Sequence, residues 1–314
     1  MQSVANRVTY LIIKGVKHLN RVRTALQLDK IYQQGYVGEG VTTVIFDTGV
    51  NHKHPDLKGQ VLAFLDCVNG RGNCYDDNGH GTHIAGILAG TGVASRKKYQ
   101  GVAPGGKLVI VKILDANGNG KLKSIIQGID WVLCHQQTYH IKIANISLGA
   151  AMHMRGDSEL VKKVEDLWDA GIVVCVAAGN QGPELQSIGA PGNSRKVITV
   201  GVWDDEGVEM HGRMVDGYSG RGPTVDCIKK PDVVTMGSNI MSCNGKGTSQ
   251  LYTRKSGTSM ATPIVSGSIA LLLQRYPHMT TREVKIRIKE TAISMGLPHF
   301  RQGWGKLNVM DLMR

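Results

Sequence analysis

The feature that most constrains the fold is a series of short apolar segments that alternate with longer amphipathic ones. The short segments have the length and composition of buried strands, and the longer ones repeat apolar residues with the period of a helix. The expected strands cover residues 41–46, 108–114, 143–148, 172–178 and 197–202, and the expected helices cover residues 80–89, 123–135, 158–170, 264–274 and 281–291. This alternation predicts an α/β fold, a single three-layer domain with a mostly parallel central sheet and helices on both faces.

The length of the chain is sufficient for one sizeable core, since 41% of its 314 residues are hydrophobic. We find no linker after residue 25, so we expect an N-terminal extension at 1–25 and one domain at 26–314. No apolar run reaches the roughly 18 residues of a membrane-spanning helix, so no membrane span is expected. The first residues lack the pattern of a secretion signal. A cytoplasmic location is therefore expected.

The six cysteines are scattered and lack the spacing of a metal site. Cys134 and Cys175 lie in apolar patterns, so both are expected to be buried thiols. Cys67 and Cys74 share one loop and could either form a disulfide or remain free. We expect no metal site in this set and no required cofactor.

The charge of the chain is strongly positive, with a formal net charge of +12. Basic clusters occur at residues 14–18, 96–98 and 229–230, but they lack the interleaved aromatic residues of a nucleic-acid site. A solvated basic surface is therefore the favoured interpretation, and no nucleic-acid partner is expected. The sequence does not indicate an oligomeric state.

Four polar residues stand where the expected strands and helices meet. Asp47 ends the first strand and Asn180 follows the strand at 172–178, while His80 opens a helix and Ser259 precedes the apolar helix. The carboxyl ends of parallel strands meet at one edge of a sheet, where α/β proteins place their sites. Each residue also has an ordinary alternative: Asp47 and Asn180 as turn residues, Ser259 as an N-cap, and His80 with His83 as metal ligands.

These four residue types suit nucleophilic catalysis. A serine hydroxyl needs a base to take its proton, and a histidine does this best when a buried carboxylate orients it. A serine at a helix N-terminus also lies where free backbone N–H groups favour a developing negative charge.

The motifs around these residues resemble a known family. Residues 47–49, 80–83, 178–180 and 257–263 resemble the four signatures of the subtilisin-like serine proteases, in the family's order Asp, His, Ser. Lesser similarities occur at residues 219–223, 230–232 and 303–308, so the resemblance extends over about residues 26–313. It implies a serine endopeptidase, with an inactive scaffold that binds peptides or protein partners as the alternative and a serine esterase or ligase as a third hypothesis.

The resemblance also implies a role for each site residue. Ser259 is the nucleophile, His80 the general base and then acid, Asp47 the residue that orients His80, and Asn180 the oxyanion donor. Protein or peptide substrates would bind as an extended strand to two segments and meet a specificity pocket. Those substrate-binding residues are Ser147, Leu148 and Gly149, then Asn117, Gly118 and Gly120, with Gly189 and Ala190 at the base of the pocket. The small Gly189 and Ala190 predict a preference for large apolar residues before the scissile bond.

The sequence departs from the family pattern at two places. The family's calcium loop follows the His helix, but residues 90–98 contain no carboxylate and include Arg96, Lys97 and Lys98. Only Asp56 matches a ligand position, which leaves at most weak Ca²⁺ binding. Second, few residues precede the domain, as in the cytoplasmic, short-leader bacterial subtilases. Residues 8–13 have strand-like composition, and we hypothesise either an inhibitory arm near the cleft or a cover for an apolar patch.

Overall fold

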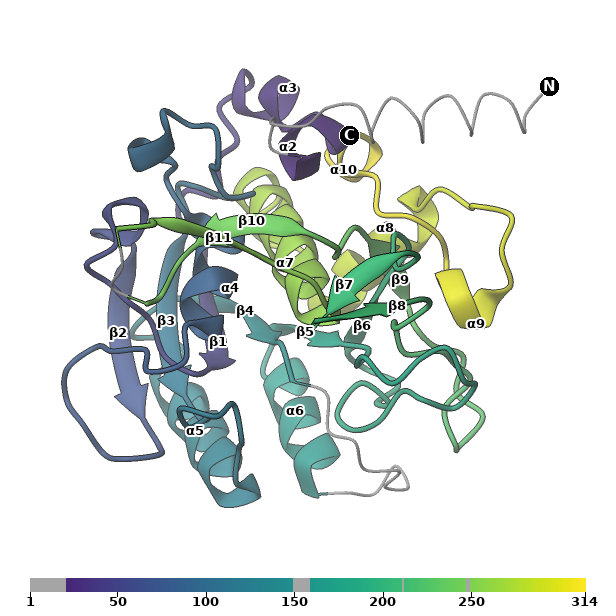
Figure 1. Cartoon of the computed structure of the whole chain (residues 1–314), viewed down its shortest axis with the longest axis horizontal. Coiled ribbons are helices and arrows are strands. Elements are labelled where there is room, and N and C mark those ends of the chain that lie inside the picture. Colours follow the sequence, from purple (N-terminus) through teal and green to yellow (C-terminus); the bar gives the residue numbers. More distant parts are fainter. Residues whose placement is uncertain (1–20, 149–158, 211, 247–248) are drawn as a thin grey trace.

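A seven-stranded sheet forms the centre of the molecule (Figure 1). The structure, a computed structural model, describes residues 21–148, 159–210, 212–246 and 249–314. All neighbouring strands of this sheet run parallel, in the order β2-β3-β1-β4-β5-β6-β9. The strands are β1 (Thr42–Asp47), β2 (Val61–Asp66), β3 (Lys107–Lys112), β4 (Ile141–Ile146), β5 (Val173–Ala177), β6 (Ile198–Val202) and β9 (Val233–Thr235). The predicted α/β fold is confirmed.

Helices cover the sheet on both sides, as predicted (Figure 1). Helices α4 and α7 pack against each other and against the sheet, whereas α5 and α6 pack together at its other side. The helices are α4 (His80–Ala89), α5 (Leu122–His135), α6 (Glu159–Asp169), α7 (Thr258–Arg275), α8 (Thr281–Thr291), α9 (His299–Gln302) and α10 (Val309–Leu312). Because both faces are covered, β1 is buried along its whole length.

Helix α7 begins six residues earlier than the sequence predicts. It starts at Thr258 and contains Pro263 in its interior. Helix α7 contacts β4, β5 and β6, and its buried residues include Met260 and Ala261, which precede the apolar pattern that begins at Ile264. Ser259 therefore lies in the first turn of α7, rather than before the helix.

Two antiparallel hairpins and the two edge strands of the sheet, β2 and β9, were not predicted. The hairpins pair β7 (Val208–Met210) with β8 (Arg213–Val215), and β10 (Ile240–Cys243) with β11 (Tyr252–Lys255). Their strands have three or four residues, too few to establish an alternating pattern. The β10–β11 hairpin packs on α4, and β11 leads directly to the start of α7.

The sequence-based expectations for Cys134 and Lys230 are wrong, and the open question about Cys67 and Cys74 is answered. Cys134 is exposed because α5 turns another stripe, which includes Ile129 and Val132, to the core, whereas Cys175 is buried as expected. Cys67 and Cys74 are free thiols. Lys230, expected on a solvated surface, is only 1% exposed.

The amino-terminal part of the described chain packs on the same core as the rest. Val22 in helix α2 (Arg21–Ala25) and Leu26, in the turn before helix α3 (Leu28–Tyr32), are both buried in the core, one on each side of residue 25. The packing is therefore continuous across that position. Residues 8–13 lie outside the described residues.

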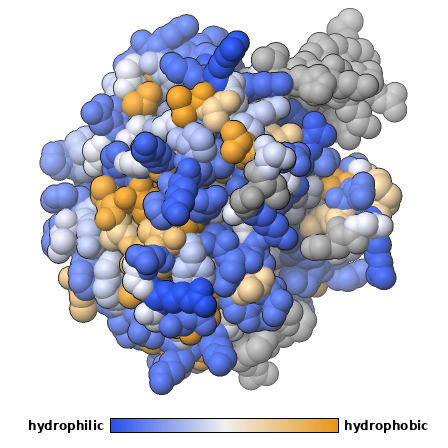
Figure 2. All heavy atoms as spheres, turned by 60° about the vertical axis from the view of Figure 1, so that its left-hand side comes forward, coloured by the Kyte–Doolittle hydropathy of each residue, from blue (hydrophilic) through white to orange (hydrophobic). Residues whose placement is uncertain are grey.

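The surface in Figure 2 is mainly hydrophilic, with hydrophobic side chains in small separate groups on the described part of this face. Among the described residues, no helix is both long and apolar enough to cross a membrane.

Candidate active site

A cleft of about 740 Å³ lies at the carboxyl-terminal edge of the sheet. It brings together nine of the residues singled out from the sequence, from six separate segments of the chain. These residues are His80, Asn117, Gly118, Gly120, Ser147, Leu148, Asn180, Ala190 and Ser259. Asp47 lies behind His80, Gly189 is absent from the described lining, and Gly149 lies outside the described residues.

The contact between Asp47 and His80 defines the centre of the site. Nδ1 of His80 lies 2.8 Å from Oδ1 and 2.9 Å from Oδ2 of Asp47. The Asp47 side chain is fully buried, whereas the His80 side chain remains 23% exposed. Oδ1 of Asp47 also accepts a hydrogen bond of 2.7 Å from the backbone N–H of Thr48. The carboxylate therefore directs Nδ1 inward and leaves Nε2 of His80 for the cleft.

A glycine makes this contact sterically feasible. A Cβ atom at Gly81 would lie 2.2 Å from the carbonyl oxygen of Gly49 and 3.1 Å from Oδ1 of Asp47. A larger residue would force the first turn of α4 away from the end of β1. The Gly that follows His80 thus permits the close approach of these two elements.

Ser259 presents its hydroxyl in the same cleft. Its Oγ donates a hydrogen bond of 3.1 Å to the carbonyl of Ser147, and the Ser147 hydroxyl donates one of 3.1 Å to the Ser259 carbonyl. A hydroxyl has a single hydrogen, so in this arrangement Ser259 does not donate to His80. Catalytic hydrogen bonds often align only when substrate is bound, so the arrangement is compatible with a Ser–His pair.

The side chain of Asn180 is fixed in one orientation by Thr258. Oδ1 of Asn180 accepts hydrogen bonds of 2.9 Å from the backbone N–H and 3.0 Å from the hydroxyl of Thr258. A Cβ atom at Gly257, which has φ of 146°, would lie 3.2 Å from Nδ2 of Asn180. The amide N–H₂ group of Asn180 is thereby held next to Thr258, the first residue of α7, which directly precedes Ser259. Among the described hydrogen bonds, this N–H₂ group donates to no acceptor.

Asp76 is an important residue that the sequence analysis missed. Its Oδ2 accepts bonds of 2.9 and 2.6 Å from the backbone and hydroxyl of Thr82, and its Oδ1 accepts one of 2.7 Å from the N–H of Gly79. Burial alone would raise the pKa of Asp76, but the hydrogen bonds from Thr82, Gly79 and Thr48 lower it below its ordinary value. Asp76 thus accepts hydrogen bonds from backbone N–H groups at the start of α4, the helix that carries His80. The signal in the sequence that could have indicated Asp76 was its position, four residues before His80 and just before the expected helix.

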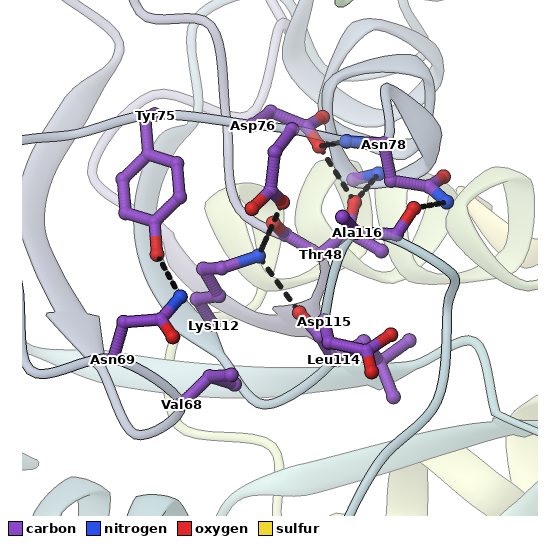
Figure 3. A network of polar contacts seen from close by, with 12 residues as sticks. Thr48, Val68, Asn69, Tyr75, Asp76, Asn78, Lys112, Leu114, Asp115 and Ala116 are labelled. Atoms are coloured by element: carbon purple, nitrogen blue, oxygen red, sulfur yellow. Dashed lines mark hydrogen bonds and ion pairs between the residues drawn. The ribbon is translucent and has the colours of Figure 1, made fainter.

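Lys112 forms a second unpredicted network beside the site (Figure 3). Its ammonium is fully buried and donates to the carbonyls of Thr48 at 2.7 Å and Leu114 at 2.8 Å and to the carboxylate of Asp77 at 2.7 Å. Lys112 is also the neighbour of Asp47 in the pairing of β1 with β3. All three of its N–H groups are satisfied, so Lys112 fixes the loop that follows β1.

The walls of the cleft are partly apolar and partly charged. Leu114, Ile125, Leu148 and Leu160 contribute apolar side chains, and the exposed Asn117, Gly118 and Gly120 contribute backbone from a loop closed by the Leu114–Gly120 bridge. Further lining residues not predicted from the sequence are Glu209, Met210, Arg254 and Lys255. The lining therefore combines apolar and charged side chains with a glycine-containing loop.

A candidate metal cluster does not fit a metal. His54, Asp56 and Cys243 have donor atoms within 4.8 Å of one another. However, Asp56 accepts from the N–H of Ala94 and the hydroxyl of Tyr252, and Nδ1 of His54 accepts from the N–H of Asp56. Burial raises the pKa of the Cys243 thiol, which favours its protonated form. These donor atoms are already used within the protein.

His83, the second histidine of the 80–83 motif, is a core residue. It is fully buried, and its Nε2 lies 3.1 Å from the carbonyl of Ile240 and 3.2 Å from that of Thr253. Its Nδ1 is buried without a hydrogen-bond partner. Burial is the main cause that lowers the pKa of His83 to about 3. The ring is therefore neutral, with its single N–H directed at the two carbonyls.

Comparison with known proteins identifies the family. Residues 38–305 match the family model described as the subtilase family. The chain is 44% identical over 276 residues to the serine protease AprX of Bacillus subtilis (strain 168), a match that covers 82% of this chain and 62% of AprX. It is 34% identical to subtilisin DY of Bacillus licheniformis, over 90% of this chain and 94% of that protein.

A solved structure agrees with these matches. The crystal structure of a cold adapted subtilisin-like serine proteinase superimposes with a TM-score of 0.69 at 30% identity, over 87% of this chain and 88% of that one. The fold, the order of the motifs and the similarity over most of the chain lead to one conclusion: this protein belongs to the subtilase family.

Proposed function

We propose that this protein is a serine endopeptidase that hydrolyses peptide bonds through an acyl-enzyme. The observation that carries the proposal is the contact of His80 with the buried carboxylate of Asp47, in a cleft that also holds Ser259. Two relatives with similar sequences, named as a serine protease and a subtilisin, support the same activity.

In the acylation step, Oγ of Ser259 forms a bond to the carbonyl carbon of the substrate while its proton passes to Nε2 of His80. Asp47 stabilises the resulting imidazolium through Nδ1. The substrate oxygen, now negatively charged, accepts hydrogen bonds from Nδ2 of Asn180 and from the backbone N–H of Ser259. The C–N bond then breaks, and His80 returns the proton to the departing amine. Water attacks the acyl-enzyme by the same route and releases Ser259.

The substrate binds as an added strand. The backbone of residues 117–120 on one side and of Ser147 and Leu148 on the other provides the partners for an extended chain. Leu148, Leu114 and the small Ala190 line the same cleft as Ser259. This lining supports a preference for large apolar residues before the scissile bond.

A fluorophosphonate probe tests the proposal directly. The probe should label wild-type protein at Ser259, because only an activated serine reacts with it. Peptide turnover should fall in proportion to the fraction of protein that is labelled. Ser259→Ala should abolish labelling, and His80→Ala should slow it strongly. Ser294→Ala, which changes an exposed serine outside the cleft lining, is the matched control and should label as wild type does.

The same experiment distinguishes the alternatives. Folded wild-type protein without labelling would support a peptide-binding scaffold in place of an enzyme. Labelling together with ester turnover but no peptide turnover would support an esterase. For Asn180→Ala we expect a loss in kcat, and the value established for subtilisin, a member of this family, is about 10²–10³.

A further inference from the structure

A second pocket, of about 310 Å³, lies apart from the cleft and shares no lining residue with it. It is formed by the end of α6, the segment before β6 and one side of α8. Because α6 and that segment lead into the first residues of β5 and β6, the pocket is at the amino-terminal edge of the sheet, opposite the candidate active site. We call it the Trp168–Trp304 pocket; its other lining residues are Ile286 and the cations Arg195, Lys196, Arg282, Lys285 and Lys289.

Lys285 forms the fixed floor of this pocket. Its ammonium donates to the carbonyls of residues 195–197 at 2.8, 3.0 and 2.8 Å. The ammonium also lies 5.8 Å from the ring centroid of Trp168 and 5.9 Å from that of Trp304. One fixed cation therefore contacts both indole rings, and the two tryptophans form the aromatic part of the pocket lining.

The rim of the pocket carries positive charge that the protein does not neutralise. Arg195, Arg282 and Lys289 are exposed, and none of the three has a carboxylate partner within the described ranges. Arg282 and Lys289 are two turns apart on α8, so they lie on one side of that helix. Between them the apolar Ile286 is 42% exposed. This side of α8 therefore presents two cations without carboxylate partners among the described residues, on either side of an exposed apolar side chain.

The neighbouring surface limits the length of such an anion. Lys196, at one edge of the pocket, pairs with Asp169 at 2.7 Å and with Glu165 at 3.7 Å. These carboxylates, Glu159 and Asp166 line an adjacent groove on α6 together with Lys162 and Lys163, so that groove is of mixed charge. The positive charge of the rim therefore does not continue along α6. A short acidic peptide matches the extent of the positive rim better than a long phosphate backbone does.

From these contacts we propose that the Trp168–Trp304 pocket binds an acidic segment of a partner protein. One large apolar or aromatic side chain of the segment packs between the tryptophans and Ile286, and flanking carboxylates pair with Arg195, Arg282 and Lys289. Arginine suits this role because its planar guanidinium binds a carboxylate through two hydrogen bonds. The partner does not occupy the cleft, so its binding is independent of catalysis and of the function proposed above.

Fluorescence anisotropy tests this proposal with full-length Ser259→Ala protein, which should not digest the probe. The probe is a short labelled peptide of Asp and Glu residues around one Trp, at physiological salt. Three comparison probes are the same peptide with Ala for Trp, the same peptide with Lys for its acidic residues, and a single-stranded oligonucleotide. We expect only the acidic Trp peptide to bind well. Wild-type protein that has first reacted with a fluorophosphonate should bind this peptide with the same Kd as the Ser259→Ala protein.

Charge reversal identifies the site. Arg282→Glu/Lys289→Glu should raise the Kd of the acidic Trp peptide at least about tenfold, a loss of about 1.4 kcal/mol. Lys53→Glu/Lys58→Glu makes the same change in net charge at exposed positions outside the pocket and should leave Kd unchanged. Both pairs of substitutions are at exposed positions, and equal thermal unfolding will show that each variant is folded. Equal peptide affinity in the two double variants, equal binding of the Ala probe, or tighter binding of the oligonucleotide would overturn the proposal.

Discussion

The Oδ1 atom of Asp76 accepts a hydrogen bond of 2.8 Å from the hydroxyl of Thr48, and this contact joins the two segments that carry Asp47 and His80. Thr48 follows Asp47 directly, and its hydroxyl oxygen also accepts from the N–H of Gly81, next to His80. Asp76 in turn bonds the first turn of α4. The geometry of the Asp47–His80 pair therefore depends on a carboxylate that does not line the cleft.

The first prediction concerns this positioning residue. Asp76→Asn replaces one acceptor oxygen with a donor that faces other donors, so α4 should shift relative to β1. We expect kcat to fall about 10- to 100-fold, since small displacements of catalytic groups have effects of this size. The rate is measured on a peptide substrate and normalised to the active fraction from fluorophosphonate labelling.

Asp77→Asn is the matched control for Asp76→Asn. It changes the adjacent carboxylate, which bonds Lys112 but not the first turn of α4. It should reduce kcat much less. Equal loss in both variants would show that the loop as a whole, rather than Asp76, positions His80.

The second prediction concerns specificity. Ala190 lines the cleft, and its small side chain leaves room for a large one from the substrate. In a peptide library the wild type should cleave after Leu, Met, Phe or Tyr. Ala190→Leu fills part of that space and should lower kcat/KM for Phe more than for Ala at the same substrate position. A wild-type preference for Arg or Lys would contradict the proposal.

The third prediction concerns acid stability. His83 has a pKa of about 3 when folded, so in the range between this value and its ordinary pKa of about 6.5 only the unfolded chain binds the proton. Its contribution to stability is therefore complete above about pH 6.5 and is lost as the pH falls. Between about pH 6.5 and pH 5 the expected loss is about 2 kcal/mol. Protonation is unfavourable because the second N–H would have no acceptor at the buried Nδ1.

Urea unfolding at several pH values measures this effect, in the Ser259→Ala background to prevent self-digestion. His83→Gln keeps a donor for the carbonyls of Ile240 and Thr253 but does not titrate. Its unfolding free energy should depend less steeply on pH than that of the parent. Identical slopes would rule out the role of His83.

The fourth prediction concerns calcium. The carboxylate of Asp56 already accepts hydrogen bonds from Ala94 at 2.9 Å and Tyr252 at 2.8 Å, and Arg96, Lys97 and Lys98 on the following loop are exposed. This environment is unfavourable for a divalent cation. EDTA should therefore change the melting temperature little relative to EDTA saturated with calcium. A decrease above about 15 °C would correspond to several kcal/mol and would indicate a structural metal.

The fifth prediction concerns the first twenty residues. Arg21 pairs with Asp204 at 2.6 Å and donates to the carbonyl of Ser238, next to Asn239 in the cleft lining. A shortened chain should therefore begin at Arg21, so that its ion pair with Asp204 is kept. Burial raises the pKa of Asp204, and the charge of Arg21 counteracts that effect. If residues 8–13 act as an inhibitory arm, this chain will show a higher initial rate and no lag. An unchanged rate with a lower melting temperature would instead support the cover for an apolar patch.

The sequence by itself determined the fold class and indicated the candidate site residues. Both depend on local patterns: buried parallel strands such as β1 are continuous apolar runs, and the motifs at Asp47, His80, Asn180 and Ser259 are short. The order of elements then brings these residues to one sheet edge, because parallel strands all end there.

Only the tertiary structure decided which other polar residues support the site. Asp76 and Lys112 have no distinctive sequence pattern, and each is held by a partner distant in the chain, which for both includes Thr48. The same applies to the Trp168–Trp304 pocket, whose residues come from segments more than a hundred positions apart. A charged side chain is stable in the interior only when folding supplies its hydrogen-bond partners, and those partners are set by three-dimensional packing rather than by neighbouring residues.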